Sequence, residues 1–398
     1  MLFRSLSISY AADGQTINEL SLGVHIAVPA LLLTPESRWD AMARERMSTV
    51  YAPGQKIQML PEAIVRCFSL DEGKLCPALS LYVRFNGQCE VVGEETKLER
   101  VKIRANLRHD QLESSIDEQV IEDWERAVWP KAVLAEDLMQ ALGQLWRISK
   151  RLQAERETVR GRPEPRFRSD FHFRIQDDRV EIEQRRRDAP LDRIVAEMMI
   201  LANSRWGRWV ALNRLPAIFR SQSMGRARMT THPIAHQGLG VGQYLWATSP
   251  LRRYADLVNQ RQLLALATRQ RPPFSQESAD LHRVIAGFDA RYDAYNDYQN
   301  SMERYWSMRW VEQMKPEGAE RPMRFRAMAL REQRARLRDA PLVFALPDMP
   351  DGHAGRGLWV EFVKMYWLDL SIEVRMLAWD DEPSAESADG SSQTSGDG

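Results

Sequence analysis

The 398-residue sequence is poor in cysteine and has no long apolar run, and both absences exclude whole classes of protein. Its cysteines, Cys67, Cys76 and Cys89, lie far apart without any Cys-x-x-Cys pair, so neither a disulfide framework nor a zinc site is indicated. No stretch approaches the roughly 18 to 20 apolar residues of a membrane span, and MLFRSLSISYAADG at the start lacks the apolar core of a signal peptide. We therefore expect a cytoplasmic globular protein without membrane association.

A net charge is also missing, because 55 Lys and Arg residues balance 55 Asp and Glu residues. The basic charge is nearly all arginine and clusters at 150–174, 185–187, 220–228 and 321–338, whereas 380–398 carries only acids. Arginine suits bidentate phosphate contacts and stacking on bases, and local fields steer ligands more than total charge does. The distribution is compatible with a polyanionic partner despite the neutral total.

Hydrophobic periodicity predicts several elements along the chain. Two strands alternate around Asn86-Gly87, a strong hairpin signal, and long helices are predicted at 135–156, 190–203 and 275–314. Between 321 and 378, short alternating runs are spaced like the strands of a five-stranded OB-type barrel. The remaining 380–398 has the composition of a disordered acidic tail.

The most informative stretch is 244–263, YLWATSPLRRYADLVNQRQL. It is interpreted as one helix in which Thr248 or Ser249 caps the start and a proline fits the first turn. Arg252 and Arg253 then lie where exposed backbone N–H groups and the helix dipole already favour an anion. The pattern predicts a phosphate site, and the plainer alternative is a solvated helix face of paired arginine and aspartate side chains.

Residues 244–257, Tyr-x-x-x-Thr-Ser-Pro-Leu-Arg-Arg-Tyr-x-Asp-Leu, resemble the signature of the ribonuclease II (RNB) family of magnesium-dependent, processive 3′-to-5′ exoribonucleases. The resemblance implies an α+β fold with a mixed α/β RNB catalytic domain, truncated at its N-terminus, over 1–315. It further implies an S1-like OB β-barrel over 321–379. Single-stranded RNA is the partner implied for a chain expected to be monomeric.

The same resemblance assigns roles to individual residues. It places Arg252 at the catalytic centre beside the scissile phosphate, and it places Tyr51, Glu197, Arg253 and Tyr254 against the RNA. Plainer roles stay open for three of them. The tyrosine could pack in its own loop, the glutamate could belong to an exposed helical stripe, and Arg253 could form an ion pair with the aspartate at i+3.

Relatives hold their magnesium ions with aspartates that end in an Asp-Asp pair before an Ala-Leu-Ser-like segment. In this sequence Leu6 to Ser9 fit that segment, Arg4 and Ser5 stand where the pair is expected, and no carboxylate occurs before Asp13. Magnesium needs oxygen anions. The resemblance therefore implies Mg²⁺ as cofactor while its ligands are not present in this chain, and we expect the chain as written to be inactive.

Three hypotheses follow. The first is an exoribonuclease whose recorded reading frame starts too late or is shifted. The second is a non-catalytic protein that binds single-stranded RNA through arginine contacts and stacking. The third is a helical interaction protein whose arginine runs are solvated faces.

Overall fold

A computed structural model describes residues 4–380, apart from 14–15, 114, 124–133, 165–168, 187–188, 224, 276–277 and 316–322. The acidic tail expected up to 398 lies outside the described residues. The chain folds as two compact units. One comprises 1–49, 57–166 and 188–292, and the other comprises 50–56, 167–187 and 293–398. In the part of the chain so described, no helix is long and apolar enough to cross a membrane.

The first unit contains one large sheet, several helices and a small hairpin. Its strands are β1 Arg4–Asp13, β2 Thr16–Ala27, β5 Leu75–Phe85, β6 Val91–Lys102, β9 Phe219–Ser221 and β10 Arg228–Thr230. Its helices are α1 Arg38–Arg46, α2 Glu62–Phe68, α3 His109–Leu112, α4 Glu118–Glu122, α5 Glu136–Arg160, α6 Pro190–Leu212 and α7 Tyr254–Thr268, with short 3-10 turns at Pro29–Leu31 and Gln237–Leu239. Helix α8, Ala279–Gln313, is divided between the units after Tyr292.

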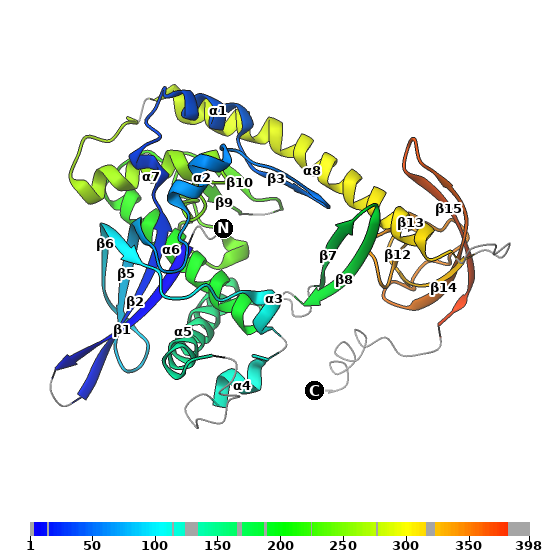
Figure 1. The fold of residues 1–398 in the computed structure, drawn as a ribbon, viewed down its shortest axis with the longest axis horizontal. Helices are drawn as coiled ribbons and strands as arrows, with labels where there is room; N and C mark the ends of the chain where they lie inside the picture. Colours follow the sequence, from blue (N-terminus) through cyan, green and yellow to red (C-terminus); the bar gives the residue numbers. More distant parts are fainter. Residues whose placement is uncertain are drawn as a thin grey trace, which may run out of the picture. The chain divides into compact units, whose positions relative to one another are not determined.

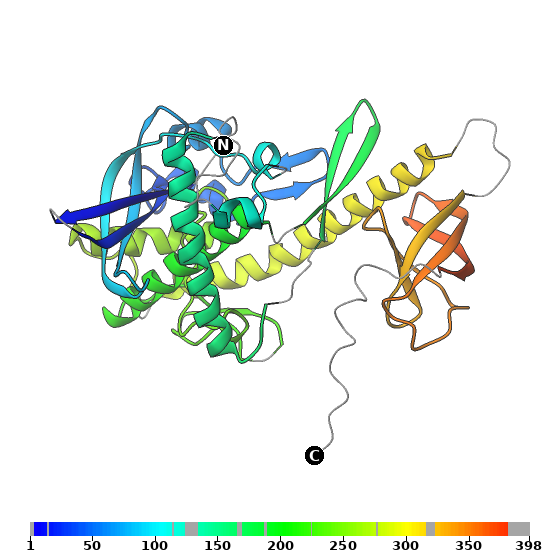
Figure 2. The ribbon, with the colours of Figure 1, turned by 90° about the horizontal axis from the view of Figure 1, so that it is seen from below.

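The large sheet is antiparallel, in the order β1-β2-β5-β6 (Figure 1). The hairpin predicted around Asn86-Gly87 is confirmed as the β5–β6 pair. Alternation along β2 buries Leu22, Val24 and Ile26 on one face of the sheet. Helices α5 and α6 cover that face, as Figures 1 and 2 show. The result is a two-layer α+β unit, in agreement with the expected fold class.

Helix α7 is the centre of the first unit. All but four of its residues are buried, and these include Asp256, Asn259, Gln260 and Arg261 as well as apolar side chains. The alternative of a solvated Arg/Asp face is therefore excluded for the body of this helix. A helix buried all round must satisfy its polar side chains internally, and these side chains hold the surrounding loops.

The second unit is built on a five-stranded antiparallel sheet in the order β13-β12-β11-β14-β15. Its strands are β11 Met323–Ala329, β12 Arg334–Leu337, β13 Val343–Ala345, β14 Gly357–Tyr366 and β15 Ser371–Trp379. The unit also contains β3 Val50–Ala52, most of β4 Gln55–Ile57, and the hairpin β7 Ser169–Gln176 with β8 Arg179–Arg186.

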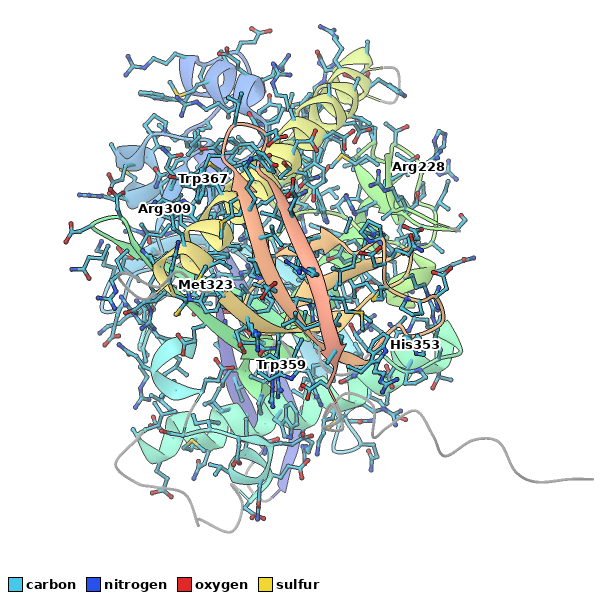
Figure 3. The ribbon with its side chains drawn as sticks, turned by 90° about the vertical axis from the view of Figure 1, so that its right-hand side faces the viewer. Arg228, Arg309, Met323, His353, Trp359 and Trp367 are labelled. Carbon is cyan, nitrogen blue, oxygen red and sulfur yellow. The ribbon has the colours of Figure 1, made fainter. Side chains whose placement is uncertain are left out.

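Aromatic and aliphatic side chains of α8 pack on this sheet. Met308, Trp310 and Val311 share one core with Val360 and Phe362. On the outside of the unit, Figure 3 shows Trp367 beside Arg309, whose guanidinium carbon lies 6.0 Å from the centroid of the indole ring. A five-stranded barrel was predicted here, and a sheet of five strands is present.

Candidate nucleic-acid interface

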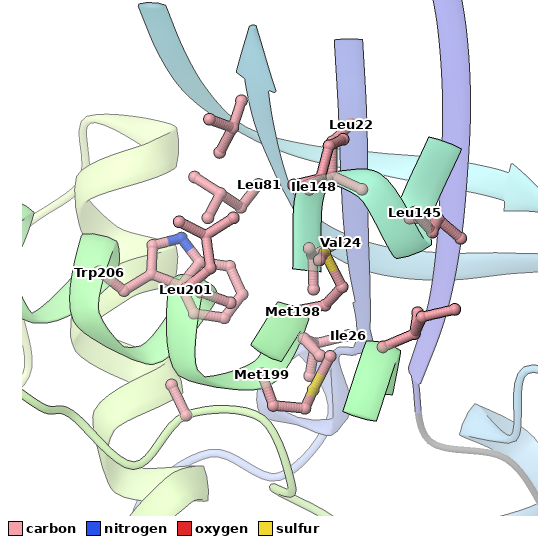
Figure 4. Packing of buried hydrophobic residues seen from close by; sticks show 14 of the residues in the cluster. Leu22, Val24, Ile26, Leu81, Leu145, Ile148, Met198, Met199, Leu201 and Trp206 are labelled. Carbon is pink, nitrogen blue, oxygen red and sulfur yellow. The ribbon is translucent and has the colours of Figure 1, made fainter. Parts of the chain in front are cut away.

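Packing of α6 against the sheet fixes the floor of the site. Met198, Leu201 and Trp206 of α6 contact the row formed by Val24 and Ile26 of β2 (Figure 4). This packing holds Asn203, which lies between Leu201 and Trp206 on the same helix, in the interior, where it is 1% exposed. Asparagine in such a place is costly unless its amide is fully bonded.

The Asn203 side chain uses its amide to hold the turn that precedes α7. Its Oδ1 accepts from the Ala247 backbone N–H at 3.0 Å, and its Nδ2 donates to the Tyr244 hydroxyl at 3.2 Å and to Thr248 Oγ1 at 3.3 Å. The turn is therefore fastened to the rigid α6 layer.

Helix α7 begins later than the sequence predicts. Thr248 or Ser249 was the expected cap, but the helix starts at Tyr254 and Arg253 is its extended N-cap residue. The cause is pairing with another segment, because the Thr49 N–H binds the Arg252 carbonyl at 2.9 Å and the Tyr254 N–H binds the Met47 carbonyl at 2.8 Å. Sequence periodicity cannot reveal such a partner. The two arginines therefore lie on a turn before the helix.

Arg253 has the structural contacts that its spacing predicts. Its Nη2 donates to Asp256 Oδ1 at 2.7 Å, which confirms the i, i+3 ion pair. The same carboxylate oxygen accepts from the Ser249 N–H at 2.8 Å. The guanidinium carbon of Arg253 also lies 4.0 Å from the centroid of the Trp246 ring. Arg253 is thereby fixed in place with its charge beside its neighbour Arg252.

Arg220 brings a second positive charge to the same indole ring. Its guanidinium carbon lies 4.5 Å from the centroid of Trp246, and its backbone N–H binds the Tyr244 carbonyl at 2.8 Å. Burial and, less strongly, the charge of Arg253 lower the pKa of Arg220. A lowered pKa of an arginine indicates that its surroundings disfavour the charge it carries.

Arg4 adds a further positive charge near Arg252 and Arg253. In the β1–β2 register Arg4 lies opposite Ile26 and Leu6 lies opposite Val24, so both occupy the covered face of the sheet. Burial and the charges of Arg252 and Arg253 lower the pKa of Arg4 to about 10. Among the described residues, neither Arg4 nor Arg252 has a hydrogen bond or ion pair through its side chain.

Polar atoms without partners accompany these cations. Within the described part of the chain, Ser249 Oγ, Asp256 Oδ2 and Arg253 Nε are buried and make no hydrogen bond. Buried polar groups are nearly always bonded in folded proteins. The turn therefore combines excess positive charge with unused donors and acceptors.

These surroundings do not fit the magnesium ions implied by the resemblance. The described residues contain no group of three or more His, Cys, Asp or Glu side chains able to hold a metal ion. The charges of Arg252 and Arg253 act on Arg4, and the carboxylate of Asp256 is engaged by Arg253. Magnesium requires several oxygen ligands, and three guanidiniums repel it.

Glu197 is also not available to a ligand in this structure. It is 3% exposed, and its carboxylate accepts two hydrogen bonds from Arg156, one of them from Nε at 3.0 Å. The plainer alternative, an exposed helical stripe, is wrong, because α6 turns this face toward α5. Arg156 is held further by the Leu239 carbonyl at 2.8 Å. Contact between Glu197 and RNA would require this pair to open.

The two tyrosines differ sharply. Tyr254 is 0% exposed, and its hydroxyl donates to Asp40 Oδ1 at 2.7 Å, so its expected place against RNA is corrected to a structural one. Tyr51 belongs to the second unit and is 42% exposed, with Lys56 Nζ 5.7 Å from the centroid of its ring. Its ring is open to stacking.

Sequence reasoning missed Trp246, Arg220 and Arg156 as parts of the site. Trp246 occupies one of the unspecified positions in the signature, and Arg220 lies within a basic run that was noted only for its charge. No local pattern pairs Arg156 with Glu197, because they are on different helices and 41 positions apart.

Comparisons with known proteins show the family of the chain. The family model described as "RNB domain" matches residues 6–224 and 221–269, which together cover most of the chain and include the turn with Arg252. The chain belongs to the RNB domain family. This RNB chain is 26% identical over 337 residues to an uncharacterised ribonuclease of Synechocystis, covering 77% of the chain and 48% of the relative.

Solved structures show the same fold. Dss1 exoribonuclease of Candida glabrata, an active site mutant, superimposes with a TM-score of 0.76 at 17% identity over 94% of this chain and 52% of its own. RNase R of Mycoplasma genitalium in complex with single-stranded RNA gives 0.74 at 13% identity, over 94% and 69%. Yeast Ssd1, a pseudonuclease, gives 0.62 at 14% identity, over 90% and 50%. The RNB chain spans about half the length, or less, of the curated relatives it matches.

Proposed function

We propose that this RNB chain binds single-stranded RNA at the turn before α7 and, as the 398 residues given, does not hydrolyse it. The observation that carries the proposal is Arg252, a cation without a side-chain partner among the described residues, on a turn fastened to α6. A guanidinium held in this way suits a backbone phosphate. Mycoplasma genitalium RNase R, of the same fold, was solved with single-stranded RNA, which supports the choice of ligand.

Lack of hydrolysis is proposed from the charges that are present. The family resemblance implies magnesium-dependent 3′-to-5′ hydrolysis to nucleoside monophosphates, in which metal ions activate water and stabilise the leaving oxygen. Arg4 lies on the covered face of β1 under the charges of Arg252 and Arg253, and by the family resemblance it stands where a carboxylate would hold the metal. The pseudonuclease Ssd1 shows that this fold occurs in a protein described as non-catalytic.

A second candidate is the hydrolysis itself, performed by a longer protein in which other residues supply the acidic ligands. The relatives support it, since they are named ribonucleases and the matched region covers only 48% and 36% of their lengths. No specific observation favours the helical interaction protein.

In the second unit, we propose the S1-like OB domain at 321–379 and base stacking by Tyr51. The five-stranded sheet has the strand number of an OB fold, and Tyr51 is exposed. The catalytic-type domain would then extend to about residue 315, and the chain would act as a monomer.

Binding and cleavage of one labelled RNA by the purified 398-residue chain test the proposal. Fluorescence anisotropy should show saturable binding of a single-stranded oligoadenylate in either magnesium or EDTA, and a gel of the same mixtures should show intact RNA. The same oligonucleotide annealed to its complement serves as control and should bind more weakly. Magnesium-dependent release of mononucleotides would establish the second candidate, and absence of binding would remove both.

A further inference from the structure

Four arginines from three parts of the first unit lie near the start of α7, where two of them contact Trp246 and the charges of Arg252 and Arg253 act on Arg4. Arg4 comes from β1, Arg220 from β9, and Arg252 and Arg253 from the turn. The buried carboxylate among them, Asp256, already pairs with Arg253. Like charges brought together and partly removed from water destabilise a fold unless something compensates them.

Arg4 is the unexpected member of this group. It continues an inward-facing row whose other members, Leu6 and Ile8, pack against the apolar core. A leucine or methionine would fit that pattern without cost. The chain instead holds a guanidinium there, and the charge of Asp256 offsets only part of the effect of burial and of Arg252 and Arg253.

We propose that Arg4, Arg252 and Arg253, supported by Arg220, form a phosphate-binding site that works without any metal ion. The identity of the ligand as a phosphate of an RNA strand rests on the proposed function. The site itself rests on the arrangement of the arginines. In this chain the guanidinium of Arg4 supplies positive charge that a metal ion would otherwise supply.

The chemistry of the group selects phosphate. Guanidiniums present planar pairs of donors that match two oxygens of one phosphate, and several can share a tetrahedral anion. The buried, unbonded Ser249 Oγ and Arg253 Nε add donors at the same turn. A divalent cation would be repelled from the same place, so binding should be indifferent to EDTA.

The test measures thermal unfolding and ligand affinity of the full 398-residue chain in EDTA. The probes are inorganic phosphate, a nucleoside 5′-monophosphate and a single-stranded RNA, which separate free phosphate from phosphate within a strand. The variant is Arg4→Met, and the matched control is Arg66→Met, which removes an exposed arginine paired with Glu62 on α2. Arg4→Lys, which keeps the charge but loses the planar donors, is the second variant.

For the wild type we expect each probe that binds to raise the unfolding midpoint without magnesium. Arg4→Met should unfold at a higher temperature than the wild type when no anion is present, because repulsion from Arg252 and Arg253 is removed. It should also bind phosphate about tenfold more weakly, or worse, and Arg4→Lys should fall between the two. Arg66→Met should bind like the wild type.

Unchanged phosphate affinity in both Arg4 variants, or binding that requires magnesium, would overturn the site. If Arg4→Met does not fold, the proposed repulsion is contradicted, and Arg4→Lys still decides the affinity. Loss of RNA binding in every protein, with Arg4-dependent phosphate binding retained, would refute the proposed function and leave this site standing. Equal RNA affinity of the wild type and the Arg4 variants would refute the role of this site in RNA binding and leave the proposed RNA binding itself standing.

Discussion

Neighbouring residues of like chemistry have different roles at the turn before α7. Arg253 is bound by Asp256 and lies against Trp246, whereas Arg252 has no side-chain partner among the described residues. The difference follows from the backbone, because Arg253 is the extended N-cap residue whose side chain reaches the first turn of the helix. Mutations of the two arginines should therefore have different consequences, one for stability and one for ligand binding.

His25 shows a second contrast at the residue scale. It lies on the face of β2 opposite the apolar core, where Nδ1 is 2.8 Å from Ser80 Oγ and Nε2 is 2.8 Å from Ser7 Oγ. Burial lowers the pKa of His25, and the charge of Glu99, 3.9 Å away, only partly offsets this. The neutral ring, which donates through one nitrogen and accepts through the other, is the form that this network suits.

The free energy of unfolding should fall on acidification because of His25. Its pKa in the folded protein is below the unfolded value of about 6.5, so the unfolded chain binds the proton first as the pH falls through 6.5. The loss is limited to about 1.4 kcal/mol for each pH unit and ends at the lower, folded pKa. Urea unfolding at pH 8 and pH 5.5 should show a smaller decrease for His25→Gln than for the wild type. His282→Gln, an exposed site on α8, is the control, and an equal decrease in all three proteins would contradict this role.

At the scale of the element, α7 acts as the internal support of the first unit. Asn259 both accepts from and donates to the Ile218 backbone at 2.8 Å, and it donates to the Trp246 carbonyl at 2.9 Å. Gln260 bonds the Ala27 carbonyl at 2.9 Å, and Gln262 bonds the Pro216 carbonyl at 2.8 Å. The helix thereby fixes the loops that carry Arg220 and Trp246.

Replacing Asn259 by alanine should destabilise the first unit strongly. The change leaves the Ile218 N–H and two buried carbonyls without their partner, at a cost of about 2 to 3 kcal/mol. Gln270→Ala, just beyond the exposed end of the same helix, should change the free energy of unfolding by less than about 0.5 kcal/mol. Chemical denaturation of the two variants beside the wild type measures both values. Equal stability of the two variants would show that the side chain of Asn259 does not support the loops.

At the scale of the whole molecule, the features that depend on neighbouring residues could be predicted from the sequence. Hairpin β5–β6, the long helices and four of the five strands of the second unit follow from local periodicity and turn residues, which depend only on neighbours in the chain, whereas β12 was not predicted. The signature at 244–257 led to the RNB family because its ten specified residues lie within one short continuous stretch. These features are local, and the sequence contains them completely.

The features that were not predicted depend on contacts between residues far apart in the sequence. The start of α7 is shifted by backbone pairing with Met47 and Thr49, about 200 residues earlier in the chain. Glu197 is paired with Arg156 of α5, and Arg4 comes under the charge of Arg252 only when β1 folds into the large sheet. Hydrophobic periodicity in a single sequence does not reveal such tertiary contacts between distant segments.

The salt dependence of RNA binding by Arg252→Ala tests whether the turn before α7 contacts the RNA backbone. Affinity of the 398-residue chain for a single-stranded oligoadenylate is measured by anisotropy over a series of salt concentrations, beside the wild type and Arg66→Ala. We predict a modest loss of affinity and a slope of log K against log salt that is smaller by about one unit in Arg252→Ala alone, as expected for one lost phosphate contact. A slope and affinity equal to those of the wild type would contradict the assignment of this turn to the RNA backbone.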